Sequence, residues 1–115
     1  MTTLGNSPKQ EMVSVGNELM ALEASDDLRE LIAERGGRLY VWATAHGCCS
    51  GRFWLLNADT ERPSDPRLVF NPTRARGFDL YLDLAGLRPP EKLTLEAKGR
   101  HHKIKAYWND LAWVA

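Results

Sequence analysis

The sequence has few cysteines: two among 115 residues, adjacent at Cys48 and Cys49. Neighbouring cysteines cannot build the disulfide framework of a small secreted domain. Charge of one sign is also lacking, because 15 Lys and Arg residues balance 15 Asp and Glu residues. This balance argues against binding nucleic acid or a membrane surface through bulk charge. No apolar run approaches the ~18 residues of a membrane helix.

Several familiar sequence patterns are missing as well. The first residues do not show the charged and then apolar segments of a signal peptide, so we expect a cytoplasmic protein with reduced thiols. The chain has no G-x-S-x-G, H-E-x-x-H, P-loop or G-x-G-x-x-G pattern, and we expect no enzyme activity. Asp79 and Asp83 flank Tyr81 on the outer face of an expected strand, where carboxylates usually serve solubility.

The composition is that of an ordinary globular protein, with 43% hydrophobic and 26% charged residues. A chain of this size forms one domain with a core of its own. We expect a flexible leader over residues 1–11, which includes Gly5 and Pro8, and a single domain over residues 12–115.

A helix is predicted over residues 26–35. Ser25 is a good N-cap, Leu28, Leu31 and Ile32 form an apolar stripe, and Gly36-Gly37 ends the helix. Asn17 can cap an earlier helical turn, and Leu19 and Leu22 begin a helical spacing. Whether residues 17–24 join the main helix or form a separate one stays open.

After Gly37 the apolar pattern changes to the period of strands. Together with a short first strand, the predicted strands cover residues 12–15, 38–45, 52–56, 68–70, 78–84, 93–97 and 104–108. Asn71-Pro72 is expected to stop the fourth of these, and Gly99 to turn the final hairpin. The fold class is therefore α+β, mainly β, with one or two helices packed on a curled sheet of largely antiparallel strands. The four tryptophans, Trp42, Trp54, Trp108 and Trp113, are expected to fill the core or an interface.

The segment with the clearest chemical character is His46-Gly47-Cys48-Cys49-Ser50-Gly51. Thiolate sulfur is a soft ligand for iron or zinc, and His46 can add a third ligand. The alternatives are a glycine-rich hairpin whose cysteines act as small apolar residues, and a strained disulfide between Cys48 and Cys49.

A second candidate is the basic segment Lys98–Lys105. It can bind phosphate, or it is simply a solvated turn, since no aromatic residues are interleaved to stack bases. A zinc site made of Cys48, Cys49, His101 and His102 is conceivable, but the spacing matches no known finger or knuckle.

The order of elements resembles the HesB/IscA-like family of A-type iron–sulfur proteins. In that family, a helix ending in glycines leads into a strand that stops at a C-S-G turn. The resemblance covers residues 12–110. The matching segments are residues 28–37, the turn Cys49-Ser50-Gly51, and residues 68–70, 77–83, 93–95 and 107–110.

The resemblance implies a compact β-rich HesB-like domain (a pseudo-barrel or sandwich), a homo-oligomer, and iron or iron–sulfur binding in cluster assembly or transfer. Cys49 matches the family's turn cysteine, Cys48 stands where glycine is usual, and the C-terminal C-x-C pair is missing. Cys49 is then the principal ligand, Cys48 an auxiliary one and His46 a possible third, with apoprotein acceptors or cluster donors as partners. Two alternatives stay open: an interaction module without metal, and a thiol redox protein using Cys48 and Cys49.

Overall fold

The computed structural model describes residues 8–48 and 51–114. These residues form a mainly β fold with one helix, which agrees with the predicted fold class of α+β, mainly β. In chain order the elements are β1 (Pro8–Val15), β2 (Glu18–Ser25), α1 (Asp26–Glu34), β3 (Arg38–Cys48), β4 (Gly51–Asp59), β5 (Asn71–Ala75), β6 (Phe78–Asp83), β7 (Lys92–Lys98), β8 (Lys103–Trp108) and β9 (Trp113–Val114). No helix in the described part of the chain has the length and apolar character to cross a membrane.

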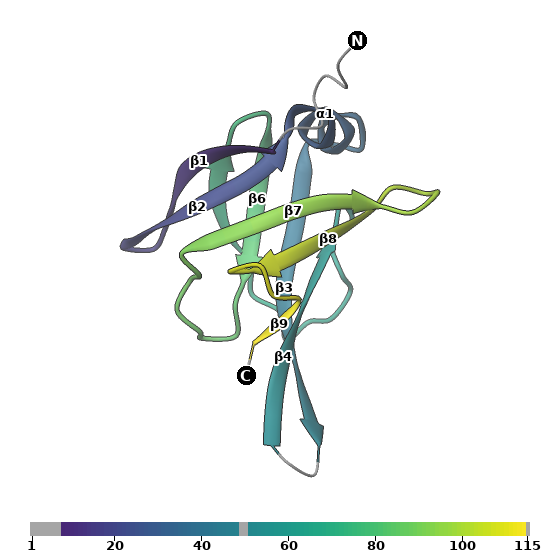
Figure 1. Cartoon of the computed structure of the whole chain (residues 1–115). Helices are drawn as coiled ribbons and strands as arrows, with labels where there is room; N and C mark the ends of the chain where they lie inside the picture. The colour runs from purple at the N-terminus through teal and green to yellow at the C-terminus, as the bar shows by residue number, and fades with distance from the viewer. Residues whose placement is uncertain (1–7, 49–50, 115) are drawn as a thin grey trace.

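The strands form two sheets, one of four strands in the order β1-β2-β7-β8 and one of five in the order β5-β6-β3-β4-β9. Figure 1 shows the four-stranded sheet crossing in front of the five-stranded sheet, with α1 at one end of the molecule. Sequential strands pair antiparallel, as predicted. Each sheet also contains one parallel pair, β2 with β7 and β3 with β6, which joins segments far apart in the chain.

The core lies between the sheets and under α1. Leu22 of β2, Leu39 of β3, Leu80 of β6 and Leu93 of β7 are each fully buried at 0% exposure, so both sheets contribute to it. The predicted alternation of β6 is confirmed, because Phe78, Leu80 and Leu82 are buried while the residues between them are partly exposed.

The main helix begins and ends as its sequence indicates. The Ser25 hydroxyl accepts a hydrogen bond from the Leu28 amide at 3.2 Å, which caps the first turn. Leu28 and Ile32 are buried, and Leu31 packs against the core. Gly36 and Gly37 both have positive φ, the conformation that ends a helix at low cost for glycine.

The helical interpretation of residues 17–24 is wrong, because residues 18–25 form strand β2. Gly16 has a φ of +62° and, with Asn17, turns the chain tightly from β1 into β2, so Asn17 is a turn residue. The buried residues of β2 include Met20, Leu22 and Ala24, which follow the period of two of a strand. The three-residue spacing of Leu19 and Leu22 had suggested a helix instead. The first strand also begins at Pro8, so residues 8–11, expected in the leader, belong to β1, while residues 1–7 lie outside the described part.

The predicted strand over residues 68–70 is also wrong. These residues lie in the loop before β5, and the strand begins at Asn71, where the prediction had it stop. Pro72 is tolerated there because β5 is an edge strand that pairs with β6 alone, so the missing N–H leaves no unpaired partner. Phe70 packs its ring edge-on against Tyr40 at 5.2 Å, which accounts for the apolar character of the segment.

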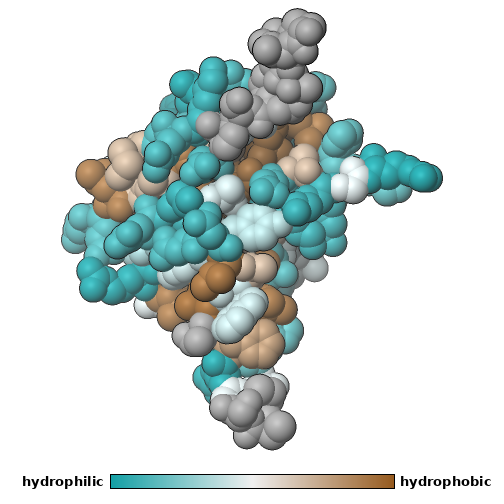
Figure 2. Space-filling view, viewed as in Figure 1, coloured by the Kyte–Doolittle hydropathy of each residue, from teal (hydrophilic) through white to brown (hydrophobic). Residues whose placement is uncertain are grey.

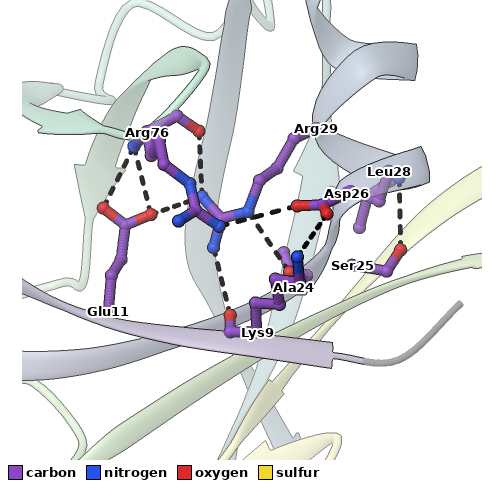
Figure 3. A network of polar contacts seen from close by, with 8 residues as sticks. All are labelled: Lys9, Glu11, Ala24, Ser25, Asp26, Leu28, Arg29 and Arg76. Carbon is purple, nitrogen blue, oxygen red and sulfur yellow. Dashed lines mark hydrogen bonds and ion pairs between the residues drawn. The ribbon is translucent and has the colours of Figure 1, made fainter. Parts of the chain in front are cut away.

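A buried arginine ties the helix to two strands and to the turn between β5 and β6. Arg29 of α1 is 4% exposed, and its Nε donates to the Ala24 carbonyl at 3.2 Å. Its guanidinium also donates to the carbonyls of Arg76 at 2.9 Å and Lys9 at 3.1 Å, and pairs with the Glu11 carboxylate. Figure 3 shows these groups converging on Arg29. The charge is buried with its hydrogen bonds satisfied, which is the condition under which such burial is tolerated.

An exposed ion pair continues this network at the start of α1. The Lys9 ammonium lies 2.6 Å from the Asp26 carboxylate, and Arg76 lies 3.5 Å from the same group (Figure 3). The hydrogen bond from Lys9 lowers the pKa of Asp26. A carboxylate in the first turn also suits the positive end of the helix dipole.

Candidate thiol site

Cys48, the first of the adjacent cysteines, ends strand β3 at the far end of a long hairpin. β3 and β4 pair antiparallel from Tyr40 opposite Asp59 to Cys48 opposite Gly51. β3 pairs with β6 up to Trp42, and β4 pairs with β9 at Trp54 and Leu55. The outer part of the hairpin therefore forms a two-stranded ribbon. Figure 1 shows this ribbon projecting from the body at the end opposite α1.

Of the two predicted thiol ligands, the structure describes the backbone of one. Cys48 is the last residue of β3, and its backbone pairs with Gly51. Cys49 lies outside the described residues, with Ser50, so its predicted role as the principal ligand stays a prediction. β3 runs to Cys48 and β4 begins at Gly51, so both strands extend further toward the tip than the predicted strands over residues 38–45 and 52–56. Gly51 has a φ of +143°, a conformation that favours glycine at this bend.

His46 stands on β3, two positions before Cys48, and alternation puts positions 46 and 48 on the same face of the ribbon. The imidazole is exposed and stacks on Phe53, its cross-strand partner, with ring centres 5.5 Å apart. Phe53 in turn meets Trp113 edge-on at 6.2 Å. The ring of His46 is thus held by aromatic packing on the ribbon and is accessible to solvent.

The tryptophans do not fill the core. Trp113 is 49% exposed on β9, Trp42 and Trp54 are partly exposed, and Trp108 packs against the edge of the core. Figure 2 shows hydrophobic surface gathered between the body and the projecting hairpin. The sequence could not place Trp113 beside Phe53, because their contact depends on β9 returning to the edge of β4.

The described side chains do not form a metal centre by themselves: no three His, Cys, Asp or Glu residues among them are grouped closely enough to hold an ion. The residues of the conceivable mixed zinc site come from two different hairpins. His101 and His102 lie at the β7–β8 turn, which Figure 1 shows pointing away from the β3–β4 tip. Arg35 donates to the carbonyls of His101 at 3.1 Å and His102 at 3.3 Å, which fixes that turn beside α1.

The carboxylates beside Tyr81 hold the backbone. Asp83 accepts from the amide of Val69 at 2.8 Å and from that of Ala85 at 2.9 Å. Asp79 lies 3.6 Å from the Arg74 guanidinium. Asp83 therefore holds the loops before β5 and after β6, and Asp79 pairs with a residue of the neighbouring strand β5.

Comparison with known proteins gives one match. Residues 20–107 match the model of the CC/Se motif containing family, over a region that includes both cysteines of the chain. No curated protein matches the chain. No solved structure matches it either. The resemblance to HesB/IscA-like proteins stays a prediction.

Proposed function

The chain belongs to the CC/Se motif containing family, and from this premise we propose that Cys48 and Cys49 bind iron or an iron–sulfur cluster for assembly or transfer to another protein. The observation that supports the proposal is the ribbon of β3 and β4, which projects from the body of the molecule and has Cys48 as the last residue of β3. Ligands presented on a projection can meet a donor or an acceptor protein, which a carrier requires. No reaction step is implied beyond ligand exchange.

The ligand set of one chain is incomplete for a cluster. One tip offers two sulfur atoms and the His46 imidazole, whereas clusters are normally held by about four thiolates. The segment after Asn109 contains no cysteine. We propose that a second copy, or the apoprotein that receives the cargo, supplies the remaining ligands. This requirement fits a carrier better than a protein with a permanent cluster.

The proposal also includes a HesB-like fold and a cytoplasmic location. The two open sheets with a capping helix suit a HesB-like domain, and the turn Cys49-Ser50-Gly51 is the motif that supports it. Reduced cysteines able to bind iron suit the cytoplasm.

The test is anaerobic reconstitution with ferrous iron and sulfide. The wild-type chain should develop visible charge-transfer absorption with bound iron, and Cys49→Ser and Cys48→Ser should lose most of both. His46→Ala should reduce iron retention less, and His102→Ala, at the other hairpin, is its matched control and should match the wild type. If the double variant Cys48→Ser/Cys49→Ser binds as much iron as the wild type, the proposal is wrong and the interaction module without metal is favoured.

A second candidate is thiol redox chemistry, which the family's description favours because it sets selenium beside the cysteine pair. The step would be exchange with a disulfide substrate: a Cys48 or Cys49 thiolate attacks one sulfur, and the other sulfur leaves as a thiolate. The second cysteine then displaces the mixed disulfide, so the chain gains a disulfide and the substrate becomes a dithiol. Thiol counting after incubation with a small disulfide tests it. A loss of two free thiols in an iron-free sample supports redox chemistry, and two unreacted thiols exclude it.

A further inference from the structure

A surface groove of about 730 Å³ lies between α1 and the four-stranded sheet, away from the cysteine pair. Its apolar part is made by Leu28 and Leu31 of α1 and by Leu95 and Ala97 of β7. Thr94 also lines the groove, and its hydroxyl oxygen is buried without a hydrogen-bond partner in the described part of the chain. An unpaired buried hydroxyl is costly, and a group entering the groove can relieve that cost.

The rim of the groove is acidic. Six carboxylate residues line it, and no Lys or Arg is among its described lining residues; the six are Glu23, Asp27, Glu30, Glu34, Glu96 and Asp110. Lys92 lies 3.0 Å from Asp110 and 3.7 Å from Glu23, so part of this charge is compensated from outside. The pair with Asp110 raises the pKa of Lys92. Asp27, Glu30 and Glu34, along the exposed side of α1, have no ion pair within the described residues.

The complementary charge is on the neighbouring β7–β8 hairpin. Between Lys98 and Lys105 the sequence has four basic residues and no acidic one, and the basic side chains are exposed. Lys98 stands directly opposite Lys103 in the ladder, an unfavourable like-charge pair that the Glu96 carboxylate, 3.5 Å from the Lys98 ammonium, compensates only in part. Figure 2 shows the tip as a hydrophilic projection. An acidic partner would remove this repulsion.

The hairpin and the groove are side by side on one molecule. His102, in the hairpin turn, lines the groove, and Arg35 fixes the same turn to the end of α1. When two copies are related by a two-fold axis near this region, the acidic groove of each copy faces the basic hairpin of the other. The arrangement therefore suits a symmetric pair of chains.

We propose that the acidic groove beside α1 binds the basic β7–β8 hairpin of a second copy, and the reverse, in a two-fold dimer. The Lys and Arg side chains of the hairpin meet the carboxylates of α1, while their aliphatic stems cover the leucines of the groove. The contact leaves the β3–β4 tips at the opposite end of each chain free. It is independent of iron binding.

The test is a charge exchange measured by sedimentation equilibrium. The groove variant is Glu30→Lys/Glu34→Lys, and the hairpin variant is Arg100→Glu/Lys103→Glu; all four positions are exposed. The wild type should dimerise at about 0.01 M salt and less at about 1 M, where ion pairs are screened. Each variant alone should be monomeric, because the charges in both of its contacts repel. Mixed in equal amounts, the two variants should form a heterodimer, because both contacts then join opposite charges.

Two further variants keep the test decisive. Glu61→Lys/Glu91→Lys changes two exposed carboxylates outside the groove by the same charge and should dimerise as the wild type does. Glu30→Gln/Glu34→Gln removes the charge without reversing it and should weaken the dimer to a lesser extent. The proposal is overturned if the wild type stays monomeric up to roughly 1 mM at low salt. It is equally overturned if a dimer forms but is unaffected by the reversals, since the contact then lies on another surface or the groove takes another occupant.

Discussion

The two ends of the molecule are built in opposite ways. At the α1 end, the Arg29 guanidinium is buried and holds carbonyls from β1, from β2 and from the turn before β6. At the β3–β4 end, the strands pair with each other, and residues 44–47 are exposed. The core cluster reaches along β3 only as far as Val41. One end therefore stabilises the fold, and the other can change without disturbing it, which suits the exchange site that we propose there.

The largest loss of stability is expected from Arg29→Met, at the α1 end. The substitution keeps the apolar stem but removes the guanidinium from three carbonyls and leaves the Glu11 carboxylate with the Arg76 amide as its donor and without its ion-pair partner. Breaking a buried pair in this way typically costs about 3–5 kcal/mol. Urea unfolding should show that loss in the free energy of unfolding.

Arg35→Met is the matched control for this change. Arg35 is exposed and donates to two carbonyls at the other end of α1, so we expect a loss of about 1 kcal/mol or less. Equal losses in the two variants would mean that the burial of Arg29 does not matter.

The same contrast explains which features could be predicted from the sequence. Local patterns were sufficient for α1, where Ser25 and the glycine pair mark the ends, and for β6, where apolar residues alternate. The cysteine pair could be singled out because its residue types carry the chemistry. The burial of Arg29 could not be predicted, since its partners lie 5 to 47 residues away in sequence. The parallel pairs β2–β7 and β3–β6 depend on long-range packing in the same way.

A smaller effect at the α1 end is expected from Ser25→Ala. The variant removes the acceptor for the Leu28 amide in the first turn, and loss of an N-cap costs about 1 kcal/mol. The urea midpoint should fall with an unchanged slope. Ser14→Ala, at an exposed position of β1, is the control and should have the stability of the wild type. If both serine variants lose the same stability, the cap is not what holds the start of α1.

The smallest change in stability is expected at the tip, from Cys48→Ser/Cys49→Ser and from His46→Ala. These positions lie beyond the pairing of β3 with β6 and of β4 with β9, so their substitution should change the free energy of unfolding by less than ~0.5 kcal/mol. Iron binding by the same cysteine variant should nevertheless be lost. A loss of more than ~2 kcal/mol in the cysteine variant would assign the cysteines to the structure of the fold. The contrast between the two ends would then disappear, because an end that stabilises the protein is poorly suited to releasing what it carries.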